Sequence, residues 1–169
     1  ALVFDPIRNV TVHFGGFGGG HQNDTWAWDG VAWQEYQPAS APSPRYHHAA
    51  AFDHNTQTIV LFGGDSAGAL SDTWEWNGHG WTRVVLSDPE GDGNPGIREG
   101  AAMAYDAARG TVILFGGLFA DTQNRFQGET WEYNGESWRR LSTTGATCRA
   151  FHAMAYDEVT RRVVLFGGL

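Results

Sequence analysis

The sequence predicts an all-β fold made of repeated four-stranded units, and three observations support this prediction. Pairs of glycines begin at residues 15, 63, 116 and 167, at intervals of 48, 53 and 51 residues. An aspartate lies ten residues before each pair: Asp5, Asp53, Asp106 and Asp157. Similar aromatic segments follow the first three pairs: DTWAWDG (24–30), DTWEWNG (72–78) and ETWEYNG (129–135). Because these parts recur in a constant order, residues 1–169 form a single domain of repeats.

Each complete unit is expected to contain four antiparallel strands, which we name a to d. In the second unit we place them at 45–52, 58–63, 72–77 and 81–86. Strand b is a continuous apolar run, which is typical of a strand buried on both faces, and strand c ends in Asn-Gly, which favours a tight hairpin turn. The glycine pair after strand b predicts a bend where a side chain would collide with the neighbouring unit. We expect the repeated tryptophans to fill the space between units.

The apolar run, the double glycine and the spaced aromatic pair ending in Trp resemble the kelch repeat. This resemblance covers nearly the whole chain and implies a kelch-type β-propeller, with four-stranded blades around a central channel. The units span about 1–44, 45–97, 98–148 and a partial 149–169, so we expect about 3.5 blades.

Such a partial propeller would expose strand edges and blade faces. We therefore expect self-association, most simply a homodimer that completes the ring. In this arrangement the strand at 149–156 of one chain would replace the start of the first strand in the other. A piece of a longer propeller is the alternative.

Composition narrows the possible functions. The net charge is −8, all 11 cationic residues are arginine, and they form no basic tract, so we do not expect nucleic-acid binding. No apolar run approaches the roughly 20 residues that span a bilayer, so we expect no membrane span. Cys148 is the single cysteine, which excludes an internal disulfide and a cysteine-only metal site. We expect no cofactor.

Loop length predicts where a ligand would bind. The b–c and d–a connections emerge on one face of an antiparallel blade, and all length variation falls there, at 118–129 in the third unit and 87–96 in the second. Since binding residues often lie on loops of a rigid scaffold, Phe119, Arg125 and Phe126 become candidate ligand-binding residues. Drift in solvated loops is the alternative explanation.

The start of strand a should lie at the channel mouth on the same face. Arg45, Arg98 and Arg149 recur there and could form an anion or carboxylate pocket. The favoured alternative is structural: each arginine pairs with the acid that opens strand c. The next residues differ between units, and we regard these differing residues as site candidates. They are Tyr46 and His47, then Glu99 and Gly100, then Ala150 and Phe151.

Evidence for catalysis is thin. His47, His48 and His152 have no diagnostic metal spacing, and buried structural histidines explain them better. A copper-radical oxidase similar to galactose oxidase would need a cysteine–tyrosine cross-link, for which Cys148 and Tyr46 are the candidates. We therefore expect a binding module for a protein, peptide or glycan, and keep an enzyme (lyase, cyclase or oxidase) with its pocket at the channel mouth as the alternative.

Overall fold

A computed structural model describes residues 1–119 and 125–169, and every regular element in these two segments is a β-strand. The first blade contains β1 (Leu2–Asp5), β2 (Val10–Phe17), β3 (His21–Trp28) and β4 (Trp33–Tyr36). The second contains β5 (Ala49–Asp53), β6 (Thr58–Phe62), β7 (Thr73–Trp76) and β8 (Trp81–Arg83). The described residues include no helix that could cross a membrane.

The third blade contains β9 (Ala102–Asp106), β10 (Thr111–Phe115), β13 (Thr130–Tyr133) and β14 (Trp138–Ser142). Between β10 and β13 lies a small hairpin of β11 (Leu118–Phe119) and β12 (Arg125–Phe126). The last unit consists of β15 (His152–Asp157) and β16 (Arg162–Gly167), which we call half-blade 4. Each full blade is a four-stranded antiparallel sheet in chain order, so the structure is propeller-like and confirms the predicted all-β class.

Strand a begins later than predicted. In the second blade it begins at Ala49 rather than residue 45, because His47 has a φ of +55°, which no regular strand allows. Residues 45–48 form a short loop instead, in which Tyr46 exchanges two backbone hydrogen bonds with Asp65 (2.9 and 3.1 Å). The candidate residues therefore lie on a loop, above the end of the sheet.

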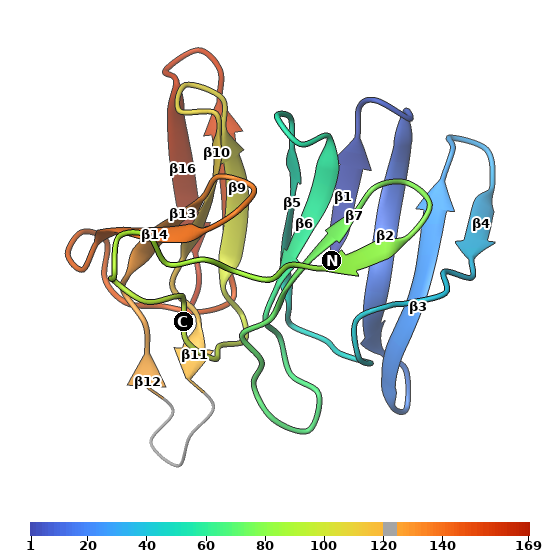
Figure 1. Cartoon of the computed structure of the whole chain (residues 1–169), viewed down its shortest axis with the longest axis horizontal. Coiled ribbons are helices and arrows are strands. Elements are labelled where there is room, and N and C mark those ends of the chain that lie inside the picture. The colour runs from blue at the N-terminus through green and yellow to red at the C-terminus, as the bar shows by residue number, and fades with distance from the viewer. Residues whose placement is uncertain (120–124) are drawn as a thin grey trace.

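The loops separate onto two faces, as predicted. Figure 1 shows the turns β1–β2, β5–β6 and β15–β16 at the top of the view, whereas the b–c connections extend from the bottom. The strands β11 and β12 of the third unit also lie at the bottom of the view. We call this side the loop face. The strands β1, β5, β9 and β15 lie next to one another as the inner strands.

The core lies between blades. One buried cluster joins the first and second blades, and another joins the second and third. Trp81 is 4% exposed and its indole N–H donates to Thr25 Oγ1 of the preceding blade (3.0 Å). Trp138 is 0% exposed and donates to Thr73 Oγ1 in the same way (3.0 Å). These two tryptophans fill the space between blades, as predicted.

The recurring aspartates and glycines are structural. Asp53 Oδ1 accepts the backbone N–H of Asn55 (2.8 Å) in the a–b turn, and equivalent bonds form in the other units. Gly63 has a φ of +65°, and a Cβ on it would lie 2.6 Å from the carbonyl oxygen of Arg98 in the next blade. No side chain fits in that gap, which confirms the collision predicted from sequence.

Candidate functional site

Two of the three recurring arginines are structural. Arg45 is 0% exposed, and its guanidinium donates to both carboxylate oxygens of Asp72 (2.6 and 2.9 Å) and to the Gly63 carbonyl (3.0 Å). Arg98 is buried in the same way, with bonds to Glu129 (3.1 Å) and to the carbonyl of Gly116 (3.1 Å). Each therefore ties strand a to the acid before strand c, as the structural alternative predicted. Their donors are not directed toward a ligand.

Arg149 differs from its two equivalents because it is only partly buried. Its guanidinium donates to the carbonyl of Gly167 (2.9 Å), which matches the bonds to Gly63 and Gly116, and to the carbonyl of Thr147 (3.0 Å). Within 1–119 and 125–169, no carboxylate pairs with it.

A backbone ladder holds the residues that follow these arginines. Gly100 N–H donates to the His47 carbonyl (2.8 Å), and Phe151 N–H donates to the Gly100 carbonyl (2.7 Å). All three residues have positive φ, at 55°, 65° and 59°. The ladder joins successive units at the start of their inner strands, so it lies at the loop-face end of these strands. The backbone is alike in each unit, and the side chains are not.

Aromatic and histidine rings gather above this ladder. His47 lies against Tyr46 and Phe151, with ring centroids 4.3 and 4.8 Å apart. Tyr46 in turn contacts His21 (5.1 Å) and Phe17 (5.6 Å). We call these five residues the mouth cluster. Phe17 is 65% exposed and Phe151 is 43% exposed, so the cluster presents a surface of rings to solvent.

Gly100 makes room for one of these rings. A Cβ at this position would lie 2.8 Å from Cε1 of Phe151. The loss of a side chain in one unit therefore allows the large side chain of the next unit to lie across the ladder.

Two carboxylates orient the cluster. The hydroxyl of Tyr46 donates to Asp65 Oδ2 (2.9 Å), and this hydrogen bond raises the pKa of Tyr46. His47 Nδ1 lies 2.8 Å from Glu99 Oε2. These acids make the mouth cluster an aromatic surface bordered by negative charge, rather than the anion pocket that free arginines would provide.

The residues predicted on the third unit's insertion lie next to this region. Leu118 exchanges two backbone hydrogen bonds with Glu99 (2.7 and 3.0 Å), so the β11–β12 hairpin begins beside the acid that contacts His47. Within the hairpin, Arg125 lies over the ring of Phe119 at 5.4 Å from its centroid, and Phe126 is 40% exposed. Residues 120–124 of the predicted 118–129 insertion lie outside the described residues.

The buried histidines pack between blades. His48 lies edge-on to Phe14 (5.6 Å) and His152 to Phe115 (5.5 Å), each against the preceding blade. Burial holds the pKa of His48 well below its usual value and also lowers that of His152. Among the described residues, no group of three or more His, Cys, Asp or Glu could hold a metal ion.

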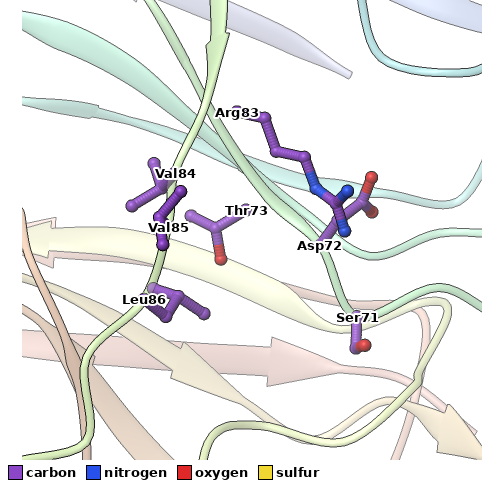
Figure 2. Close-up of a pocket in the computed structure, with 7 residues that line it drawn as sticks. All are labelled: Ser71, Asp72, Thr73, Arg83, Val84, Val85 and Leu86. Carbon is purple, nitrogen blue, oxygen red and sulfur yellow. The ribbon is translucent and has the colours of Figure 1, made fainter.

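A hollow of about 350 Å³ lies elsewhere, beside β7 and β8. Figure 2 shows Asp72 and Thr73 at its lining together with Arg83, Val84 and Leu86. The carboxylate of Asp72 is paired with Arg45, and the hydroxyl of Thr73 accepts a hydrogen bond from the indole N–H of Trp138. The hollow shares no residue with the mouth cluster, and its Asp72 and Thr73 are engaged in bonds that hold the blades, so the mouth cluster is the stronger candidate.

Sequence reasoning identified Tyr46, His47 and Phe151 but not Phe17, His21 or Asp65. A usable signal was present, since Phe17 and His21 flank the b–c connection of the first unit on the face where variation gathers. Asp65 directly follows a glycine pair, and its sequence position alone gives no signal. Its role appears only in the structure, where its loop pairs with Tyr46.

Comparison with known proteins supports the fold alone. No family model and no curated protein matches the chain. A solved structure described as the structure of YjhT is similar, with a TM-score of 0.64 and 13% sequence identity over 90% of this chain. The match covers 53% of that chain, so this protein spans about half the length of YjhT.

Proposed function

We propose that this protein is a binding scaffold of the kelch propeller type, which presents its loop face and channel mouth to a protein or peptide ligand. The observation that carries this proposal is the mouth cluster. Tyr46, His47 and Phe151 follow the recurring arginines, at positions where the otherwise regular repeat has different side chains in each unit. Phe17 and His21 join them from the b–c connection of the first unit. Packing would favour the same side chain in each blade, whereas recognition of one ligand requires different ones.

The chemistry of the mouth cluster favours a ligand with a basic side chain. A cation above an aromatic face gains electrostatic energy, on the order of 0.5–2 kcal/mol depending on desolvation. The partly exposed rings of Phe17 and Phe151 offer such faces, and Glu99 and the net charge of −8 add attraction. Arg45 and Arg98, which would attract an acidic ligand, are neutralised by their own carboxylates.

The proposal can be tested by probing arrays of basic, neutral and acidic peptides, and a glycan array, with the labelled chain. We expect selective binding of peptides that contain arginine or lysine. The variant Phe17→Ser/Phe151→Ser should lose at least roughly tenfold in affinity for these peptides, which corresponds to 1.4 kcal/mol. A second variant, Phe119→Ser/Arg125→Ser/Phe126→Ser, measures how far the ligand extends onto the β11–β12 hairpin.

A control variant removes apolar side chains that are even more exposed, from other surfaces of the protein. Val31 and Val159 are 85% and 92% exposed in turns outside the loop face, so Val31→Ser/Val159→Ser should leave binding unchanged. Glycan binding that depends on Phe17 and Phe151 would keep the site but change the ligand class. If neither array shows binding, or if all variants bind equally, the proposal is refuted.

A further inference from the structure

Two of the five residues in the mouth cluster, His21 and His47, have side chains that can gain a positive charge. Histidine changes its charge between about pH 5 and 8. The side chain of His47 is 43% exposed, so protons reach it from solvent. Since the function proposed for this cluster is the binding of a basic side chain, a charge on either imidazole acts directly on that ligand.

His47 lies against the same groups that attract a basic ligand. Its Nδ1 is 2.8 Å from Glu99 Oε2, and its ring centroid is 4.3 Å from that of Tyr46 and 4.8 Å from that of Phe151. The side chain of Glu99 is 13% exposed, and within 1–119 and 125–169 His47 is the only side chain that pairs with it. A charge on this imidazole is therefore placed beside the acid and the rings that the ligand needs.

The contact with Glu99 decides which nitrogen of His47 gains the proton. A carboxylate only accepts hydrogen bonds, so the neutral imidazole donates its Nδ1–H and keeps Nε2 without a proton. No described group is hydrogen-bonded to Nε2. An added proton therefore goes to Nε2, and the imidazolium stays bound to Glu99 through Nδ1. The charge of the acid is then neutralised, and the cluster no longer attracts a second cation.

The titratable groups next to His47 keep their charge state over this pH range. The hydroxyl of Tyr46 donates to Asp65, and this hydrogen bond raises the pKa of Tyr46, so the phenol stays neutral. The other carboxylate oxygen of Asp65 accepts the backbone N–H of Gly68 (2.6 Å). Burial holds the pKa of His48 well below its usual value, so His48 stays neutral while His47 gains a proton.

The nearest arginines carry a constant charge. Arg45 and Arg98 are buried, and each is paired with an acid of its own blade. Arg149 lies two residues before Phe151 and donates to two backbone carbonyls. Because arginine stays protonated throughout this range, none of the three responds to the change in pH.

His21 is the second titratable ring of the mouth cluster. It lies 5.6 Å from the ring of Phe17 and 5.1 Å from that of Tyr46. Within the described segments no carboxylate pairs with it, so a charge on His21 is not neutralised and adds repulsion toward a cation above these rings.

We propose, on the basis of the binding function proposed above, that the mouth cluster is a pH-gated site that takes an arginine side chain while His47 is neutral and releases it when His47 is protonated. The imidazolium neutralises Glu99 and lies against Tyr46 and Phe151, so it replaces the cation of the ligand with a cation of the protein itself. Proton and ligand therefore exclude each other. By linkage, a bound arginine must also lower the affinity of His47 for a proton.

The probe is a labelled peptide with a single arginine, taken from the array that tests the proposed function, and its affinity is measured by fluorescence anisotropy at constant ionic strength. Arginine keeps its charge at each pH, so only the protein changes. We expect the affinity to fall about tenfold from about pH 7.5 to about pH 5.5, as one nearby like charge requires. The same peptide with citrulline, which is uncharged, should show no such fall.

Substitutions at His47 separate this charge from the shape of the site. His47→Asn suits the positive φ of 55° and keeps a donor toward Glu99 but cannot gain a proton, so it should remove most of the fall. His47→Arg carries a permanent charge and should bind weakly at both pH values. The chain has seven histidines, and His79→Asn, on the exposed turn between β7 and β8, is the matched control for a general change in net charge. This control should keep the whole fall.

Isothermal titration calorimetry measures the reciprocal effect. At about pH 6.5, in two buffers with different ionisation enthalpies, binding of the arginine peptide should release protons from the wild-type protein. His47→Asn should abolish most of this release, whereas His79→Asn should leave it unchanged. A purely structural role of His47 would weaken binding equally at each pH and release no protons.

The failure of this gate is distinguishable from the failure of the binding function. If no arginine-containing peptide binds at about pH 7.5, the ligand class of the proposed function is wrong and the gate is refuted with it. If the peptide binds equally well at both pH values, or if His47→Asn keeps the fall in affinity and the release of protons, the binding scaffold stands and the gate alone is refuted.

Discussion

Trp138 and Thr73 join two blades through one buried hydrogen bond, and replacing the threonine by valine should measure its value. Thr73→Val keeps the shape of the side chain but leaves the indole N–H of Trp138 without an acceptor. Trp138 is 0% exposed and Thr73 is 1% exposed, so water cannot replace the lost bond without entering the core. A buried donor left without a partner costs about 1–3 kcal/mol. For a chain of this length we therefore expect the melting temperature to fall by roughly 2–4 °C for each kcal/mol.

Urea denaturation of the single and double variants separates the hydrogen bond from packing. Trp138→Phe removes the donor and part of the ring, and the double variant Thr73→Val/Trp138→Phe removes both partners. The two single costs should exceed the cost of the double variant by about 1 kcal/mol, because the second change no longer breaks a bond. Thr82→Val on an exposed strand position is the control and should be neutral. Single costs that simply add would show that the two residues do not interact, and would remove the basis for the Trp–Thr contact between blades.

Other perturbations test the scaffold. Arg45→Met should lower the free energy of unfolding in urea by about 3–5 kcal/mol, because it leaves the partly buried carboxylate of Asp72 unpaired. Arg149→Met at the equivalent position should leave the urea midpoint unchanged. Equal effects of the two changes would contradict the structural role of Arg45. Burial lowers the pKa of His48, so the unfolded chain binds more protons than the folded protein below about pH 6.5. Stability should therefore fall as the pH drops from 6.5 toward the folded pKa. His48→Phe should flatten this pH dependence, and an unchanged slope would show that other groups cause it. Gly63→Ala should lower the melting temperature, because its Cβ would collide with the carbonyl of Arg98, whereas a Cβ on Gly80 meets no atom within 4 Å and Gly80→Ala should leave the melting temperature unchanged. An unchanged melting temperature for Gly63→Ala would mean that the two blades separate readily.

Trp74 is one of the repeated tryptophans that we expected to fill the space between units. The structure shows Trp74 only partly buried, with its indole N–H donating to Asp72 (2.7 Å). The side chain therefore orients the acid that pairs with Arg45, and Trp76, which is 1% exposed, is the buried tryptophan of that strand.

The sequence alone determined the repeating part of this protein. The period of the glycine pairs, the apolar runs and the recurring tryptophans predicted four-stranded units and the division into two loop faces, because these features depend on local backbone geometry and on contacts made again in every unit. It also suggested that Arg45 and Arg98 pair with acids, since an arginine and an acid at constant spacing favour a constant contact. The residues that break the repeat, Tyr46, His47 and Phe151, were likewise visible as departures from the pattern.

Only the tertiary structure decided which of the residues that differ between units come together in space. Phe17, Tyr46 and Phe151 come from three different units, and no local pattern states that their loops converge at one mouth. The late start of β5 at Ala49 also escaped prediction, because the positive φ of His47 is imposed by hydrogen bonds between neighbouring units rather than by its own preference. A repeated sequence specifies the contacts that each unit makes with its neighbour, but a site assembled from several units depends on how those units curve around a common axis, and that curvature is a property of the packed blades.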